Sequence, residues 1–231
     1  PRLPEGLLLT GAVDVQSSDL FTRGAITPQS RASMAVARIL DPRPGERVLD
    51  LCSAPGTKAT HLAALMENRG DLVAVERNEG RARELRENAG RLGADIVRVV
   101  HGDARDDHGE GFDRVLVDAP CTGLGTLRSR PDLRWRATPD SARELAALQR
   151  EILAGAARAV RPGGTVVYSV CTIHPAEGED VVDQDHHDLV PDDLQTDHPL
   201  WKHPLVAHHL LAMPHRNGTD GFFIARLRRP G

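Results

Sequence analysis

Cysteine is scarce in this chain of 231 residues, which contains only Cys52, Cys121 and Cys171. An odd number of cysteines with no Cys-x-x-Cys pair argues against a disulfide framework and for free thiols in a reducing compartment. Long apolar runs are lacking too. No stretch of about 18 apolar residues predicts a membrane span, and the first residues do not read as a signal peptide. The sequence therefore predicts a cytoplasmic protein that does not enter a membrane.

Lysine and aromatic residues are also few. Only Lys58 and Lys202 are lysines, and aromatic residues make up 3% of the chain. In a chain that otherwise relies on arginine, the lysine at position 58 suggests that a compact ammonium group is needed there. The net charge of −4 does not indicate general affinity for nucleic acid, although four arginines gather within residues 128–136.

Histidine is frequent near the C-terminal end of the chain, within residues 186–215. The adjacent pairs His186–His187 and His208–His209 have no cysteine or carboxylate partners at the spacing of a metal site. This pattern favours a solvated polar surface over a zinc site, and we expect no metal. We expect the segment to pack beside the edge of the sheet that lies away from the cofactor.

Short apolar segments alternate with segments of helical periodicity, which predicts an α/β fold with a doubly wound, mostly parallel sheet and helices on both faces. The first helix is predicted to begin at Pro28, with Thr27 as its cap. Helices are predicted over 28–40, 57–68, 79–93 and 141–160 and from 175 onward, and seven strands over 47–52, 71–76, 95–100, 112–118, 165–170, 204–213 and 221–228, with 184–204 largely irregular.

Residues that can bind ligands or react lie at the carboxyl end of each of the first five predicted strands. The segment 52–56 follows the first strand, Glu76 ends the second, Asp103 follows the third, 118–121 ends the fourth, and Cys171 follows the fifth. Ligands of doubly wound sheets bind at the carboxyl ends of the strands. The sequence therefore predicts that these residues form one site.

The stretch "DLCSAPGTKAT" predicts a strand, a tight turn of small residues and a helix whose free N–H groups suit an anion or carboxylate. It is neither a Walker loop nor a complete G-x-G-x-x-G motif, and a plain turn is the alternative interpretation. Thr57 is a candidate helix cap. Glu76 is placed to accept hydrogen bonds from ribose hydroxyls and Asp103 from an adenine amino group. Together these features favour an adenosine-containing cofactor over solvated loop carboxylates.

Four stretches, "LDLCSAPGTKATHLA", "VDAPCTGLGTLRSRPDLRW", "LQREILAGAARAVRPGGTVVYSVCTIHPAEGED" and "DGFFIARL", resemble the Sun-type (Fmu-like) RNA cytosine-5 methyltransferases. "FTRGAITPQSRASMAVARIL" is similar to the element that precedes their cofactor motif, and the resemblance spans residues 15–227. The family implies a class I (Rossmann-like) methyltransferase fold, S-adenosylmethionine as methyl donor and RNA, mostly ribosomal 16S RNA, as substrate.

The resemblance also implies residue roles. Addition of a thiolate to carbon 6 of cytosine makes carbon 5 nucleophilic; the residues alone leave the choice between the two strand-end cysteines open. By the family pattern Cys171 is the nucleophile, Cys121 releases the product, and Asp118 lies between cofactor and base, where it is suited to stabilise ring nitrogen 3. The implied cofactor-binding residues are Cys52, Ser53, Ala54, Pro55, Gly56, Thr57, Lys58, Glu76, Asp103 and Asp118.

Two departures from the family pattern bear on the predictions. Val170 precedes the predicted nucleophile where the family usually has threonine, which removes one hydroxyl but not the thiol. The resemblance implies an N-terminal RNA-binding domain in ribosomal members. We expect it to be absent here, with residues 1–26 as the remnant of a linking module and 27–231 as the catalytic domain. For RNA contacts, Arg128, Arg130 and Arg134 suit phosphates, with a solvated arginine loop as the alternative.

Three other functions compete with ribosomal RNA methylation. Transfer RNA is a different substrate for the same chemistry. A non-catalytic RNA-binding or assembly factor is disfavoured by the presence of both strand-end cysteines, Asp118 and Lys58. A nucleotide-dependent oxidoreductase is disfavoured by the incomplete glycine motif. We expect a monomer.

Overall fold

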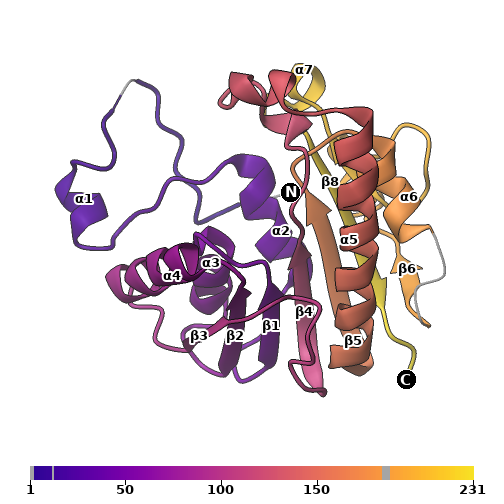
Figure 1. Cartoon of the computed structure of the whole chain (residues 1–231). Coiled ribbons are helices and arrows are strands. Elements are labelled where there is room, and N and C mark those ends of the chain that lie inside the picture. The colour runs from indigo at the N-terminus through magenta and orange to yellow at the C-terminus, as the bar shows by residue number, and fades with distance from the viewer. Residues whose placement is uncertain (1–2, 12, 184–187) are drawn as a thin grey trace.

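The computed structural model describes residues 3–11, 13–183 and 188–231. A single mixed sheet runs through the molecule, with helices packed on both of its faces (Figure 1). The strand order is β3-β2-β1-β4-β5-β8-β6, and β7 pairs with β8. The strands are β1 (Arg47–Leu51), β2 (Asp71–Glu76), β3 (Val97–His101), β4 (Phe112–Asp118), β5 (Val160–Val170), β6 (Val190–Asp192), β7 (Leu210–Ala212) and β8 (Phe222–Arg228).

The first five strands pair in parallel, whereas β8 is antiparallel to β5, β6 and β7. The predicted α/β class and mostly parallel sheet are thus confirmed. The described residues form eight strands rather than the predicted seven. The extra one is β6, which lies in the segment predicted to be irregular. It has three residues with Pro191 at its centre, and such a strand is tolerated at a sheet edge but carries almost no sequence signal.

The helices are α1 (Asp19–Thr22), α2 (Arg31–Leu40), α3 (Thr57–Leu65), α4 (Glu79–Arg91), α5 (Pro139–Ala159), α6 (Glu179–Val182) and α7 (Pro214–Asn217). Helix α5 begins at Pro139 because Thr138 and Ser141 form a reciprocal capping box. The predicted start of α2 is wrong. Helix α2 begins at Arg31 instead of Pro28, because the Ser30 side chain accepts a hydrogen bond from the backbone of Ser33 and caps it.

The predicted start of α3 at Thr57 is right, but its predicted cap is wrong. Thr57 is its first residue and not its cap; the cap position belongs to Gly56, which makes no side-chain hydrogen bond. Gly56 has a φ of 101°, and a Cβ there would lie 2.4 Å from Cδ1 of Leu85 in α4. Glycine is therefore required to turn the chain from β1 into α3.

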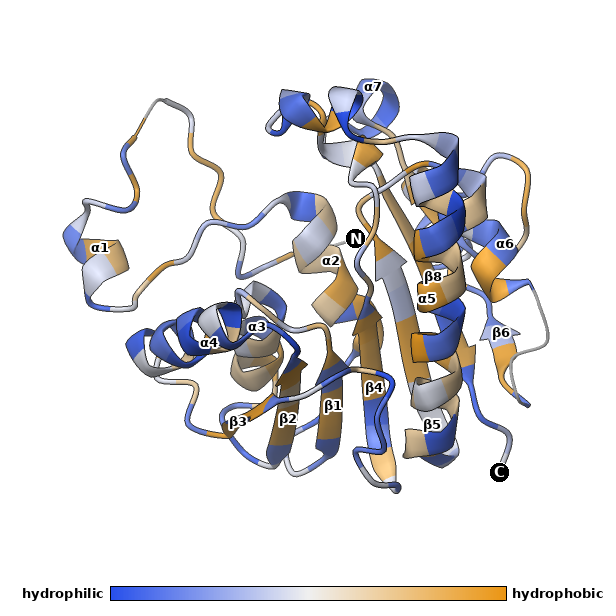
Figure 2. Ribbon diagram, viewed as in Figure 1, coloured by the Kyte–Doolittle hydropathy of each residue, from blue (hydrophilic) through white to orange (hydrophobic). Residues whose placement is uncertain are grey.

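The core lies on both faces of the sheet. Helix α5 packs with α6 over one face, and α2, α3 and α4 cover the other. Strands β1 and β2 are buried along almost their whole length, as expected for parallel strands between two helix layers, and they are coloured as hydrophobic in Figure 2. Only the strand ends reach the surface, which leaves the carboxyl edge as the place for polar chemistry.

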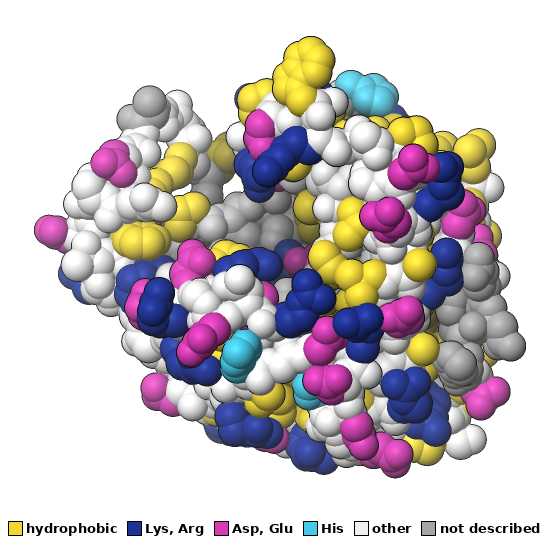
Figure 3. Space-filling view, viewed as in Figure 1, with side chains coloured by type: hydrophobic (Ala, Val, Ile, Leu, Met, Phe, Trp, Pro, Cys, Tyr) yellow, Lys and Arg dark blue, Asp and Glu magenta, His cyan; other side chains and the backbone are white. Residues whose placement is uncertain are grey.

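The N-terminal segment is tied to the helices of one layer. The Arg38 guanidinium and the His61 ring contact the carboxylate of Glu5, and the guanidinium of Arg91 lies 3.8 Å from the centre of the Phe21 ring. The surface is hollowed between this segment and the body of the molecule (Figure 3). Among the described residues, no helix is both long and apolar enough to cross a membrane.

Candidate active site

Cys121 and Cys171 are 50 residues apart in sequence, yet their sulphur atoms lie 3.3 Å from each other. Strands β4 and β5 are parallel neighbours, with Asp118 in register with Ser169, so the segments that follow the two strands leave the sheet side by side. The structure thus brings the two strand-end cysteines into contact; their membership of one functional site stays a prediction.

The backbone around Cys171 is fixed by a close crossing of two chain segments. The amide of Gly125 donates to the carbonyl of Cys171 (3.0 Å), and the amide of Gly221 donates to the carbonyl of Gly125 (2.8 Å). A Cβ on Gly125 would lie 2.0 Å from the carbonyl oxygen of Gly221. Only glycine permits this approach.

The two thiols differ in their electrostatic surroundings. The hydrogen bond to Cys171 raises the pKa of Cys121 well above its ordinary value, and burial and the Glu177 carboxylate act in the same direction. The same hydrogen bond is the largest cause that lowers the pKa of Cys171; burial and the Asp118 carboxylate oppose it, and the Lys58 ammonium favours the thiolate. Cys171 is therefore the thiol better prepared to act as a nucleophile at neutral pH.

Asp118 lies at the centre of the site. Lys58 of α3 donates to its Oδ2 (2.6 Å), and the hydroxyl of Ser169 donates to its Oδ1 (2.7 Å). The Lys58 ammonium also lies 5.4 Å from the centre of the Phe222 ring. Lys58 thus holds the Asp118 carboxylate beside the cysteine pair. Ser169 was missed, although alternation along a strand puts it on the same side as Cys171, two residues later.

Asp50 is a second residue that the sequence analysis did not single out. It is fully buried in β1, and burial raises its pKa to about 7, opposed by a 2.7 Å hydrogen bond from Ser53. Asp50 fixes the first residues of the turn that follows β1.

The turn 52–58 has the compact geometry that its small residues predict. The side chains of Arg81 and Asn88 in α4 donate to the carbonyls of Ala54 and Pro55. Cys52 adopts a left-handed conformation (φ 67°), and burial raises the pKa of its thiol far above the ordinary value, so it is not a reactive cysteine.

Glu76 and Asp103 end two neighbouring strands, but they differ in what they can still bind. Glu76 is 95% buried and accepts one hydrogen bond, from the amide of Asn78 (2.8 Å), with Arg81 3.5 Å away. Acceptor positions therefore remain for two hydroxyls. Asp103 already accepts three hydrogen bonds from Arg105, which hold its pKa well below the ordinary value. Its contact with adenine stays a prediction.

Comparison with known proteins shows the family of the chain. Residues 37–228 match the family described as 16S rRNA methyltransferase RsmB/F. The chain belongs to the RsmB/F family. The probable ribosomal RNA small subunit methyltransferase B of Bacillus subtilis (strain 168) is 40% identical over 233 residues, which cover 97% of this chain and 52% of the relative. The predicted resemblance is thereby confirmed.

Other relatives of this RsmB/F chain differ in their named substrate. A tRNA (cytosine(72)-C(5))-methyltransferase of Pyrococcus horikoshii is 36% identical, covering 90% of this chain and 54% of the relative. The crystal structure of NSun6 from the same organism with SFG, a S-adenosylmethionine analogue, has a TM-score of 0.87 and 34% identity, covering 95% of this chain and 57% of that one. The chain spans about half the length of these relatives, and the fold is that of a class I methyltransferase.

The arginine loop of this RsmB/F chain is exposed. Arg128, Arg130 and Arg134 all lie on the surface between η1 (Leu124–Thr126) and α5, and the side chain of Trp135 beside them is 83% exposed. Asp132 pairs with Arg130 at 3.5 Å. The loop directly follows the Cys121 segment, so its charges are carried on the same side of the molecule as the strand ends.

The histidine-rich segment is only partly the polar surface that was predicted; His186 and His187 fall outside the described residues. His203 and His209 are buried, and both rings pack edge-on against Phe223 of β8. Each also contacts a carboxylate of the α6 region. Burial against β8 was not foreseen because it depends on the antiparallel addition of β7 and β8. Their position beside β8, away from β1 to β3, is the predicted one.

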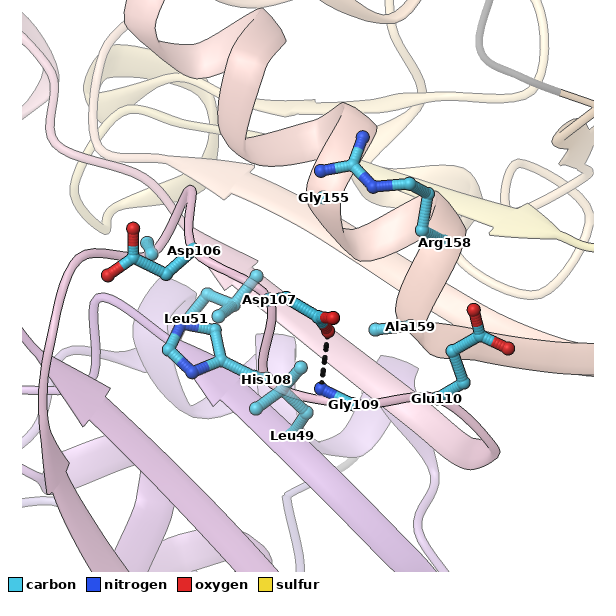
Figure 4. Close-up of a pocket in the computed structure, with 11 residues that line it drawn as sticks. Leu49, Leu51, Asp106, Asp107, His108, Gly109, Glu110, Gly155, Arg158 and Ala159 are labelled. Carbon is cyan, nitrogen blue, oxygen red and sulfur yellow. Dashed lines mark hydrogen bonds between the residues drawn. The ribbon is translucent and has the colours of Figure 1, made fainter.

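A small cavity lies on the α5 face of the sheet, between Leu49, Leu51 and the loop 104–110 (Figure 4). Its volume is about 70 Å³, whereas pockets for drug-sized ligands measure about 300–1,000 Å³. Asp107 accepts a hydrogen bond from the Gly109 amide within it (2.8 Å). The cavity is too small for a nucleoside. Among the described residues, no group of three or more metal-ligating side chains is arranged to hold an ion.

Proposed function

We propose that this chain transfers a methyl group from S-adenosylmethionine to carbon 5 of a cytosine in RNA, with small-subunit ribosomal RNA as substrate. The observation that carries the proposal is the pair of thiols 3.3 Å apart beside the Lys58–Asp118 ion pair. The names of the family and of the Bacillus relative support the ribosomal substrate.

The residues of the turn and of β2 fit the proposed cofactor. Glu76 is a buried carboxylate with acceptor positions left for ribose hydroxyls. The turn 52–58 leads directly into the start of α3 at the carboxyl edge of the sheet. The N-terminus of this helix suits the carboxylate of the methionine part of the cofactor. The cofactor supplies an electrophilic methyl group on a sulfonium sulphur. Lys58, the last residue of this turn, donates to Asp118, and the charges of both act on Cys171.

The proposed reaction begins with the Cys171 thiolate. Its sulphur forms a bond to carbon 6 of cytosine, and the electrons of the 5,6 double bond move to make carbon 5 nucleophilic. A hydrogen bond or proton given to ring nitrogen 3 stabilises the charge that develops in the ring, and Asp118 supplies it in its carboxylic acid form. After methylation, a base removes the proton from carbon 5, the double bond re-forms, and the bond from carbon 6 to Cys171 breaks. Cys121, in contact with Cys171, assists this release.

A methylation assay tests the function directly. Incubation of the protein with total bacterial RNA and methyl-labelled S-adenosylmethionine is expected to give 5-methylcytosine in 16S ribosomal RNA. The methylated position is then mapped by bisulfite sequencing. Label in transfer RNA alone would replace the proposed substrate by the second candidate, which the 36% identical tRNA methyltransferase favours. Label in neither RNA, with the cofactor bound, would contradict the activity.

Glu76→Ala is expected to weaken S-adenosylmethionine binding about 10- to 100-fold, because hydrogen bonds to a charged group contribute about 1.5–3 kcal/mol. Isothermal titration calorimetry measures the affinity without any RNA. Glu79→Ala is the matched control, since Glu79 is an exposed carboxylate three residues further on, in the first turn of α4. Equal affinities for the Glu76 variant and wild type would remove Glu76 from the cofactor site.

The assignment of residues 1–26 to a linking module and of 27–231 to the catalytic domain stays part of the proposal, as do a monomeric state and a cytoplasmic location. The monomer is supported by the site itself. All the residues of the proposed site come from one copy of the chain: Lys58 from α3, and the cysteine pair, Asp118 and Glu76 from the ends of strands in the same sheet. A second copy is therefore not needed to complete the site.

A further inference from the structure

A buried carboxylate lies behind the cysteine pair and has no part in the reaction described above. Glu177 ends the short helix η3 (Pro175–Glu177) and is fully buried. Its Oε1 accepts from the amide of Thr122 (2.8 Å) and from the side chain of Gln149 (3.2 Å), and its Oε2 accepts from the hydroxyl of Thr122 (2.5 Å). All three donors are uncharged, so its negative charge is not neutralised by them.

Thr122 is the residue directly after Cys121, so Glu177 holds the loop that carries this thiol. The hold is reinforced from other elements. Gln149 of α5 also donates to the carbonyl of Pro120 (2.8 Å), on the other side of Cys121. Tyr168 of β5 donates to the carbonyl of Glu177 (2.6 Å) and fixes the turn itself. Glu177 therefore presents a fixed charge to Cys121 from a defined position.

We propose that Glu177 is a positioning residue that decides which of the two thiols ionises: its charge keeps Cys121 protonated and leaves the thiolate to Cys171. This role rests on the proposed function, in which Cys171 attacks the base. It gives a physical reason for two adjacent cysteines to have different tasks, since either sulphur can donate the hydrogen bond between them and a negative charge beside one thiol disfavours the thiolate there.

The other charged or titratable groups that face the pair do not replace Glu177. Asp118 and Lys58 face Cys171 and are joined to each other at 2.6 Å; Asp118 opposes the Cys171 thiolate and Lys58 favours it, so the two charges act against each other. Tyr168 faces Cys121, and burial raises the pKa of its hydroxyl well above the ordinary value, so it stays neutral near pH 7. Arg150 of α5 also acts on Tyr168, whose pKa it lowers. Glu177 is the carboxylate that acts on the Cys121 side.

Glu177→Gln removes this charge with little change of shape. The amide oxygen of glutamine can take the place of Oε1 and accept from the Thr122 amide and Gln149. Its amide nitrogen then faces the Thr122 hydroxyl, which can accept that hydrogen bond and donate to the hydroxyl of Thr172 at 3.1 Å. The variant therefore has a complete set of partners and is expected to fold.

The test is the rate of alkylation of each cysteine by iodoacetamide between pH 6 and 10, measured by mass spectrometry of the peptides containing Cys121 and Cys171. In wild type, Cys171 is expected to react first. In Glu177→Gln, the ratio of the Cys171 rate to the Cys121 rate is expected to fall at least ~10-fold, which corresponds to one pKa unit. Glu179→Gln is the matched control and is expected to keep the wild-type ratio, since Glu179 faces His203.

Glu177→Asp retains the charge and is expected to keep Cys171 as the faster thiol, which also provides a result if the glutamine variant does not fold. An unchanged ratio in Glu177→Gln, or a lost preference in Glu177→Asp, would overturn the role of the charge. The readout needs neither RNA nor cofactor. If the proposed function is wrong, the wild-type protein does not methylate RNA. If this inference is wrong, the ratio of the two alkylation rates in Glu177→Gln equals that of wild type.

Discussion

Cys171→Ser is expected to abolish methylation of RNA, whereas Cys121→Ala is expected to accumulate a covalent protein–RNA adduct. Serine at position 171 cannot supply a thiolate, and loss of an enzyme's nucleophile lowers the rate by roughly 10⁴-fold or more. Removal of Cys121 leaves the attack intact but takes away the neighbouring thiol, 3.3 Å from Cys171, that we assign to product release. The first variant is therefore blocked at the attack on cytosine, and the second at the release of the methylated RNA.

Denaturing gel electrophoresis with labelled RNA measures the adduct, and single-turnover transfer of labelled methyl groups measures the chemical step. The double variant, with both substitutions, is the control, because the adduct must disappear when the attacking sulphur is also removed. An adduct that persists in Cys171→Ser and is lost in Cys121→Ala would reverse the two assignments. Full activity of Cys171→Ser would exclude the mechanism.

Asp118→Asn is expected to lower the rate of methyl transfer about 10²- to 10³-fold, the effect of losing one preorganised charge-stabilising group. The substitution is close to neutral for the structure. The asparagine oxygen can accept from the Lys58 ammonium, and its nitrogen can donate to the Ser169 hydroxyl, so both present contacts have substitutes. What is lost is the carboxyl group that faces the base.

Single-turnover kinetics measure this effect, and cofactor binding by calorimetry shows whether the site is still formed. Asp113→Asn is the matched control, because Asp113 lies on the same strand β4 and also binds a cation, Arg161 at 2.7 Å, but outside the site. A rate within about threefold of wild type for Asp118→Asn would show that this carboxylate has no catalytic part.

Much of the frame of the molecule follows from local sequence patterns. The five parallel strands, the helices between them and the placement of reactive residues at strand ends are encoded in apolar periodicity and in turns of small residues. The failures are local as well. Ser30 caps α2 in place of Thr27, and Gly56 precedes α3 where Thr57 was the candidate. Capping depends on which side chain reaches which amide, and neighbouring serine, threonine and glycine residues are alternatives that spacing does not separate.

Some features of the site also follow from the sequence, and others depend on the tertiary structure. By itself the sequence determined the chemistry available: two cysteines and an aspartate at the ends of strands and a lysine in the helix after the first strand, together with a family resemblance that assigns Cys171 as the nucleophile. Only the tertiary structure decided that the two sulphur atoms are in contact and that Lys58 pairs with Asp118. It also decided that Arg105 donates to the carboxylate of Asp103 and that Glu177 holds the loop that carries Cys121. These contacts join separate elements, and burial makes their charges effective because little water remains to screen them.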